Sequence, residues 1–192
     1  MADGLELAAL PFDQYGRHRD AREVAELVRT LEGPERLAIL DVGGCPGWMR
    51  GFLPADWLVV VDPTAGEGTS QVRASGLALP FLDASFDLVL SLDTLEHVPP
   101  DGRARYLSEL LRVARGYALV LAPFASPETE RAEALLFEYV KVALHTEHAQ
   151  LREHRLHGLP DLAATIAALE AAGAVCDTFP SGYLYQIGRA HV

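Results

Sequence analysis

Cysteine is scarce in this 192-residue chain, which contains only Cys45 and Cys176. Two cysteines cannot build a disulfide framework, and in a cytosolic setting we expect both to be thiols. Basic residues are also in the minority, because 16 Lys and Arg stand against 27 Asp and Glu and give a net charge of -11. We therefore expect no nucleic-acid substrate, since phosphate binding requires a basic surface.

Long hydrophobic runs are absent as well. No apolar run reaches the roughly 18 residues needed to cross a bilayer, and the first residues lack the charged and apolar regions of a secretory signal. These absences predict a cytoplasmic protein without a membrane span. A chain of 192 residues is long enough for one domain with one complete core.

The chain does contain an alternation of apolar strands and amphipathic helices. Apolar runs predict four strands. The first begins at Ile39, and the others cover 57–62, 87–92 and 117–121. Apolar residues at helical spacing predict helices over 24–31, 107–114, 126–144 and 162–169. We expect the apolar stripes of these helices to be buried, including Leu27 and Leu31 in the first and Leu135 and Tyr139 in the third. Alternating strands and helices along one continuous chain predict an α/β fold with a parallel sheet.

The first predicted strand breaks into a glycine-containing loop, with the sequence Ile39-Leu40-Asp41-Val42-Gly43-Gly44-Cys45-Pro46-Gly47. Gly43 and Gly44 lack the Cβ atoms that would block positive φ or close approach of a ligand, and Pro46 stiffens the exit of the loop. A nucleotide-like ligand fits this description. A tight turn between strand and helix that binds nothing is the alternative.

The second predicted strand also ends in an acid, Asp62, which Pro63 follows. Folds that bind nucleotides place a carboxylate about 20 residues after the glycine loop, where it accepts hydrogen bonds from the ribose hydroxyls. Asp62 is therefore expected to bind a ribose. The alternative is an exposed aspartate that stabilises a turn at the end of the strand.

A dinucleotide oxidoreductase is one class with such a loop, and its fingerprint is G-x-G-x-x-G. Starting from Gly43, that pattern requires glycines at positions that Cys45 and Trp48 occupy. An indole at the third position would block the close packing of helix on strand that this glycine serves. The sequence therefore disfavours NAD as the ligand.

Two segments resemble a known family. Asp41, Gly43 and Gly47 match the motif D-x-G-x-G-x-G of class I S-adenosylmethionine (SAM) dependent methyltransferases, with Cys45 in place of the middle glycine. The stretch 76–99, GLALPFLDASFDLVLSLDTLEHVP, resembles the methyltransferase type 11 group of that class. The resemblance implies a Rossmann-like sheet of order 3-2-1-4-5-7-6, flanked by helices and truncated here at the C-terminus.

The resemblance implies SAM as the cofactor. In the family, the segment around Ser75 meets the adenine, and Ser75 replaces an Asp that is common there. Ser91 and Leu92, at the end of the fourth strand, should border the methionine end. Tyr15 lies in a segment that resembles one covering the SAM pocket in related enzymes, and a surface segment without a ligand role is the alternative. The expected cofactor-binding residues are Asp41, Gly43, Gly44, Cys45, Gly47, Asp62, Pro63, Ser75, Gly76, Leu77, Ser91, Leu92 and Tyr15.

Two histidines, His97 and His154, are the candidate catalytic residues. A histidine near the reactive methyl group could deprotonate an acceptor, because its pKa lies close to neutral pH. In the family, the pair equivalent to Glu96-His97 commonly holds the loop after the fourth strand, which is the alternative. His154 lies in a segment that resembles E-H-x-x-x-G-L-P of some methyltransferases linked to surface-glycan genes, where it would contact the acceptor.

A metal site was the remaining possibility for the histidine-rich segment 145–157. Two H-x-x-H pairs are present, formed by His145, His148, His154 and His157. Ligation together with Glu147 or Glu153 is chemically possible. Because the sequence contains no H-E-x-x-H motif, we expect no metal there.

The last six residues, Ile187 to Val192, correspond to the translation of a widely used sequencing-library adapter, ATC GGA AGA GCA CAC GTC. We therefore expect a SAM-dependent methyltransferase domain over 1–186 and a non-native tail over 187–192. Residues 174–179 should then form strand six, and residues 183–186 a cut strand seven.

Together, the sequence predicts a SAM-dependent methyltransferase that acts on a small-molecule, lipid-linked or glycan-linked acceptor. The reaction needs chiefly alignment of acceptor and methyl group, because the sulfonium is already a good leaving group. A SAM-binding module without turnover is the alternative, motivated by Cys45 and Ser75. The acceptor atom and the oligomeric state remain open.

Overall fold

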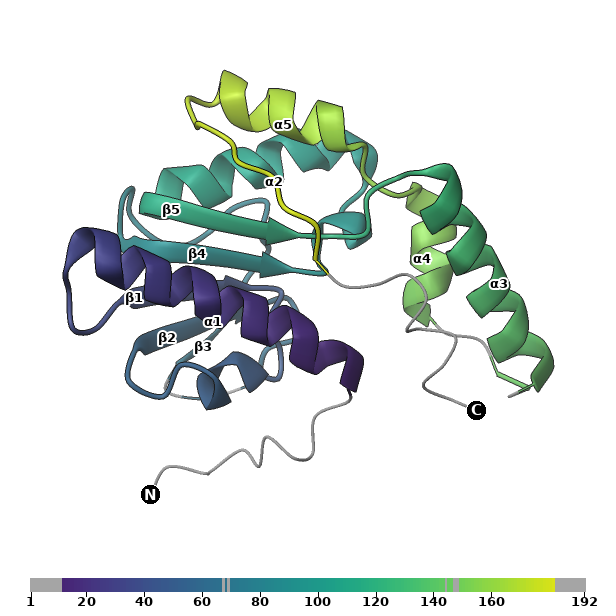
Figure 1. The fold of residues 1–192 in the computed structure, drawn as a ribbon, viewed down its shortest axis with the longest axis horizontal. Helices are drawn as coiled ribbons and strands as arrows, with labels where there is room; N and C mark the ends of the chain where they lie inside the picture. Colours follow the sequence, from purple (N-terminus) through teal and green to yellow (C-terminus); the bar gives the residue numbers. More distant parts are fainter. Residues whose placement is uncertain (1–11, 67, 69, 144, 147–148, 182–192) are drawn as a thin grey trace.

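The fold is a parallel five-stranded sheet with helices on both faces (Figure 1). The computed structural model describes residues 12–66, 68, 70–143, 145–146 and 149–181. In chain order the elements are α1 (Phe12–Glu32), β1 (Ala38–Val42), the 3-10 helix η2 (Trp48–Gly51), β2 (Trp57–Asp62), β3 (Gln71–Arg73), β4 (Phe86–Leu92), the 3-10 helix η3 (Leu95–His97), α2 (Pro100–Val113), β5 (Ala114–Leu121), α3 (Pro127–Ala143), α4 (Ala149–His157) and α5 (Leu162–Ala171).

The strand order is β3-β2-β1-β4-β5. The central strand β1 pairs with β2 on one side and β4 on the other, with Leu40 opposite both Val59 and Val89. The order of connections therefore reverses between β1 and β4, and ligands of open α/β sheets bind outside the carboxyl ends of the strands at such a point. These five strands agree with the first five positions of the expected order 3-2-1-4-5-7-6.

The expected sixth strand is not present. Residues 174–179 follow α5 without forming a strand. A strand requires a hydrogen-bonding neighbour, and the neighbour expected for strand six is strand seven, whose residues the structure does not describe. The residues expected to form strand seven, 183–186, and the expected tail over 187–192 lie outside the described residues.

One face of the sheet packs against α1. The buried apolar residues that are described on this helix are Ala21, Ala25 and Val28, which recur at i, i+4 and i+7. The expectation that Leu27 and Leu31 belong to the buried stripe was wrong, because their exposed fractions are 56% and 60%. Small alanine side chains let the helix lie close to the strands, so the leucines are turned toward solvent.

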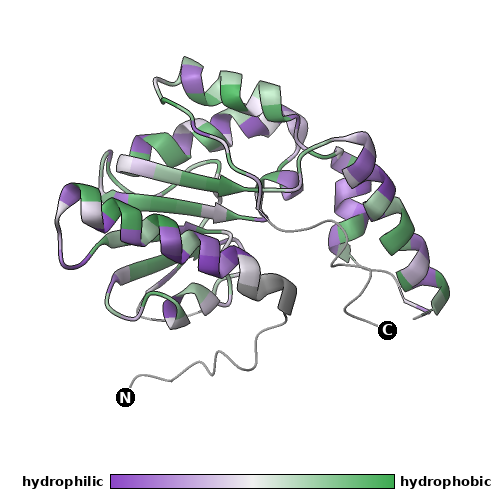
Figure 2. Cartoon of the chain, viewed as in Figure 1, coloured by the Kyte–Doolittle hydropathy of each residue, from purple (hydrophilic) through white to green (hydrophobic). Residues whose placement is uncertain are grey.

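The other face is covered by α2, and α5 packs on α2. α2 begins at Pro100, where a missing N–H costs the helix nothing. Its four buried side chains are Tyr106, Leu107, Leu110 and Val113. Figure 2 shows mostly apolar strands between helices that mix hydrophilic and hydrophobic residues. None of the described helices is long and apolar enough to cross a membrane.

The helices α3 and α4 lie beyond the carboxyl ends of β4 and β5, toward which the arrowheads of these strands point (Figure 1). α4 contacts the sheet region through η3. The segment 95–97 and α4 therefore meet at the same edge as the loop after β1.

Candidate active site

The loop after β1 is held against the loop after β4. Gly43 has φ +82°, and a Cβ atom there would lie 2.3 Å from Oγ1 of Thr94. The Thr94 hydroxyl in turn lies 3.2 Å from both the Val42 and the Leu92 carbonyl oxygens. A residue with a side chain at position 43 would therefore have to adopt a strained conformation and displace Thr94. Sequence reasoning predicted the glycine and missed its threonine partner.

Asp41, at the start of this loop, is a buried acceptor. Its side chain lies so close to Gly44 that a Cβ atom there would be 2.0 Å from Oδ2. Asp41 is only 2% exposed, and its Oδ1 has no hydrogen-bond partner among the described residues. Burial, with a smaller contribution from the negative charge of Asp62, raises the pKa of Asp41 to about 7. A donor from a ligand would satisfy this oxygen, so the loop fits a ligand that carries an N–H or ammonium group.

Cys45 occupies a position where a side chain is tolerated. The described non-glycine residues with positive φ are Ala84, Asp93 and His145, so the backbone at Cys45 is in an ordinary region. The loop closes at Gly47, which has φ +99° and donates its N–H to the Gly44 carbonyl oxygen at 2.7 Å. The family's middle glycine is therefore not required at position 45.

We expect Cys45→Gly to bind SAM within about twofold of the wild-type affinity. The exchange should lower the free energy of unfolding by less than about 1 kcal/mol, because glycine adds freedom mainly to the unfolded chain. Calorimetric titration with SAM and chemical denaturation check the two values. Complete loss of SAM binding in a folded variant would show that the thiol itself is essential.

Asp62 ends β2 next to this loop. Its Oδ1 accepts hydrogen bonds from the Thr64 backbone N–H at 2.7 Å and from the Thr64 hydroxyl at 2.5 Å. Asp62 therefore does stabilise the turn, which was the alternative interpretation. These bonds do not use Oδ2, which leaves a carboxylate oxygen for a ribose hydroxyl. Pro63 follows as an exposed residue of the turn.

The segment 75–77 follows β3 at the same edge of the sheet. Ser75 is exposed, and its Oγ accepts a hydrogen bond from the Leu77 N–H at 3.2 Å. Gly76 lies against the ring of Tyr106 on α2. The Ser75 side chain is thus used in its own turn, so the backbone of this segment is the part that can meet an adenine.

Ser91 and Leu92 end β4, where they were expected to border the cofactor. The Ser91 side chain is fully buried, and its Oγ lies 2.8 Å from the Tyr106 hydroxyl. Burial raises the pKa of Tyr106, which therefore stays protonated. The side chain of Ser91 therefore belongs to the core, and the half-buried Leu92 packs against the core cluster that includes Ala21 and Ala25 of α1.

The first turns of α1 lie over the loop after β4. Arg17 Nη1 lies 2.5 Å from Oδ2 of Asp93. Asp93 has φ +47°, an uncommon backbone conformation that aspartate tolerates better than most residues. This ion pair brings the start of α1 to the carboxyl edge, as expected for a segment covering a pocket. The side chain of Tyr15, two residues earlier, lies outside the described part of the structure.

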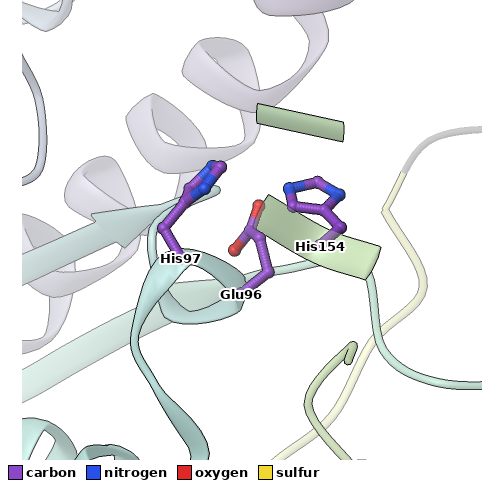
Figure 3. A group of neighbouring side chains, drawn as sticks. All are labelled: Glu96, His97 and His154. Carbon is purple, nitrogen blue, oxygen red and sulfur yellow. The ribbon is translucent and has the colours of Figure 1, made fainter. Parts of the chain in front are cut away.

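Beyond Asp93, Glu96 and the two candidate catalytic histidines form a cluster (Figure 3). The rings of His97 on η3 and His154 on α4 lie 4.8 Å apart, centroid to centroid. His97 Nδ1 is 2.8 Å from Oε2 of Glu153, and His154 Nδ1 is 2.7 Å from Oε1 of Glu133. The structure thus brings together two histidines that the sequence places far apart, and adds Glu96 to them.

The charges in this cluster are strongly coupled. Burial and the neighbouring Asp93 raise the pKa of Glu96 to about 8. Burial lowers the pKa of His97, and nearby His154 lowers it further. Burial is the largest single influence on the pKa of His154 and lowers it, but the hydrogen bond to Glu133 and the nearby negative charges together outweigh burial, so that pKa is raised. His97 is therefore, of the two histidines, the one that is more fully in its neutral form at pH 7, which is the form that can take up a proton.

The two H-x-x-H pairs do not form a site in the described region. His145 is exposed and has φ +50°, and His157 lies outside the histidine–glutamate cluster. His148 and Glu147 lie outside the described residues.

A surface hollow of about 380 Å³ lies elsewhere, between α1 and the segment before β2. It contains none of the loops described above, and its polar lining does not include a histidine. Its lining residues are Arg22, Glu26, Arg29, Gly51, Phe52, Leu53, Pro54, Ala55 and Asp56. The candidate site is therefore defined by the carboxyl-edge loops.

Comparison with known proteins shows which families this chain is similar to. Residues 40–121, which run from the middle of β1 to the end of β5, match the family model described as a methyltransferase domain. An uncharacterized methyltransferase of Mycobacterium sp. (strain KMS) is 36% identical over 137 aligned positions, covering 60% of this chain and 54% of that protein. An uncharacterized methyltransferase from Mycolicibacterium gilvum (strain PYR-GCK) is 38% identical over 127 positions, covering 55% of this chain and 49% of that protein. The chain spans about half the length of these relatives.

Solved structures share the fold. YcgJ from Bacillus subtilis has a TM-score of 0.53 at 17% identity, covering 79% of this chain and 68% of that one. The PH0226 protein from Pyrococcus horikoshii OT3 has a TM-score of 0.52 at 15% identity, covering 80% of this chain and 81% of that one. The fold is the Rossmann-like α/β fold of class I methyltransferases. By sequence, residues 40–121 are similar to a methyltransferase domain.

Proposed function

We propose that this protein is a SAM-dependent methyltransferase that acts on a small-molecule, lipid-linked or glycan-linked acceptor. One observation carries the proposal. At the point where the strand order reverses, the buried oxygen Oδ1 of Asp41 has no donor among the described residues, and it lies beside Gly43 and Gly44, where a Cβ atom would collide with Thr94 and with Asp41 itself. Asp62, on the neighbouring strand, adds a carboxylate oxygen for a ribose.

The residues present fit the cofactor. The loop 43–47 would lie along it, and Asp41 would accept a hydrogen bond from its amino-acid end. Asp62 Oδ2 would bind the ribose, while the backbone of 75–77 would meet the adenine. When bound, SAM supplies a methyl group on a sulfonium, which is activated toward nucleophiles.

The chain's own contribution would be alignment and proton removal. The Arg17–Asp93 ion pair holds the start of α1 over the site and helps to exclude water. His97 and His154 each have Nδ1 directed to a glutamate, which leaves Nε2 to accept a proton from an acceptor hydroxyl or amine. Because the pKa of His97 is lowered by burial, its neutral form is available at pH 7.

Formation of S-adenosylhomocysteine tests the proposal. The protein would be incubated with SAM and a panel of alcohols, phenols, amines, glycans and lipid-linked glycans, and the product measured by mass spectrometry. We expect acceptor-dependent product, which His97→Gln reduces at least tenfold, while His157→Gln on the same edge leaves it unchanged. SAM binding without product for any acceptor would favour a SAM-binding module without turnover. That alternative is motivated by Cys45 and Ser75, which stand where the family usually has Gly and Asp.

A further inference from the structure

We propose that Glu96, His97 and His154 form a binding site for one divalent transition-metal ion. The site would lie between η3 and α4, beside the loop after β4. This inference concerns metal binding by the protein alone and does not depend on the methyltransferase function. A bound ion and an acceptor proton would compete for the same Nε2 lone pairs, so the proton removal proposed above refers to the metal-free site.

The three side chains converge on one point. Each offers one ligand atom, and these atoms lie within 4.8 Å of one another. Figure 3 shows the Glu96 carboxylate directed between the two imidazole rings. An ion bound at about 2.0–2.2 Å from each ligand atom needs only small side-chain rotations to bring all three into contact.

Two buried atoms of the cluster have no hydrogen-bond partner among the described residues. They are Oε2 of Glu96, a residue only 1% exposed, and Nε2 of His154. Although they belong to one cluster, they are not hydrogen-bonded to each other. Leaving two such atoms unsatisfied is costly, and a cation between them would serve as the common partner of both.

The surroundings orient the histidines as in established metal sites. Ligating histidines almost always direct the ring nitrogen that does not bind the metal to a carboxylate or carbonyl, which fixes the tautomer. Here His97 Nδ1 contacts Glu153 and His154 Nδ1 contacts Glu133, at 2.8 and 2.7 Å. In both rings this arrangement leaves the Nε2 lone pair for a metal.

The ligand set indicates the kind of ion. Two imidazoles and one carboxylate favour zinc or iron(II), whereas magnesium and calcium prefer oxygen ligands. Three protein ligands also leave one or more coordination positions open. Because Glu96 and His97 lie on η3 and His154 lies on α4, the ion would fasten α4 to the loop after β4.

Zinc titration of the full chain, first freed of metal with a chelator, tests the proposal. We expect one equivalent of ZnCl₂ to bind with a Kd in the micromolar range or below and to raise the Tm. Cobalt(II) in place of zinc should give the visible absorption of a four- or five-coordinate ion. No binding of zinc at 100 micromolar would overturn the proposal and would leave an ordered water as the partner of the two atoms.

Variants separate the site from adventitious binding. Glu96→Gln keeps the side-chain shape but removes the charge. Glu96→Gln and His154→Asn, each made as a single variant, should weaken zinc binding at least tenfold. Glu133→Gln, which acts through His154, should weaken zinc about 10–100-fold. His157→Gln, on α4 but outside the cluster, is the matched control and should change nothing. Equal losses in Glu96→Gln and His157→Gln would contradict the site, and circular dichroism verifies that each variant is folded.

Discussion

Asp41→Asn is expected to raise the free energy of unfolding at pH 8 by about 2–4 kcal/mol. Asp41 is buried, and its pKa in the folded protein is about 7 instead of the ordinary 3.8. At pH 8 the folded protein must therefore hold a buried carboxylate whose Oδ1 has no partner among the described residues. Asparagine has the same shape and no charge, so this cost disappears.

The pH dependence gives the effect its signature. The folded state binds this proton more tightly than the unfolded state, so the contribution of Asp41 to stability falls as pH rises from about 4 to about 7. Urea denaturation of both proteins from pH 4 to pH 8 should show a difference that is near zero at pH 4 and largest above pH 7. Asp177→Asn, at an exposed position, is the control. A difference independent of pH would refute the assigned role of the Asp41 charge.

Asp62→Ala is expected to weaken SAM binding about 10–150-fold, equivalent to about 1.5–3 kcal/mol for a lost charge-assisted hydrogen bond. The physical reason is the loss of a carboxylate that accepts from the ribose hydroxyls. Calorimetric titration with SAM measures the change.

Because Asp62 also accepts two hydrogen bonds from Thr64, two further variants separate the roles. Thr64→Val removes one bond of the turn and should change SAM affinity less than about threefold, since the ribose partner remains. Asp62→Asn keeps an acceptor for the turn and removes the charge, so it should weaken SAM to an intermediate degree. Unchanged affinity in a folded Asp62→Ala variant would mean that the ribose is held elsewhere.

The sequence predicted the edge of the sheet where the site lies. Apolar runs that end in Asp41 and Asp62 mark strands buried on both faces, and parallel strands place their carboxyl ends together. The order of the strands came from the family resemblance, because periodicity does not specify which strands are neighbours. The three-residue strand β3 carries no apolar run, so hydrophobic pattern alone could not identify it.

Contacts between distant segments were beyond sequence reasoning. Thr94 bridges the loops after β1 and β4, and Glu96 joins His154 from a different element. No local sequence pattern marks Thr94 or Glu96 for these contacts, because each contact depends on how distant elements pack against one another. The prediction for the apolar stripe of α3 was wrong for the same reason. Leu135 and Tyr139 were expected to be buried, but their exposed fractions are 65% and 45%.

The most direct test of the central claim is calorimetry with SAM, S-adenosylhomocysteine and NAD on the same preparation. Trp48 begins η2 where a dinucleotide fingerprint requires a glycine, and Asp41 offers an acceptor for an ammonium group. We predict that SAM and S-adenosylhomocysteine each bind with a stoichiometry of one and that NAD binds at least tenfold more weakly. Tighter binding of NAD than of SAM would contradict the account.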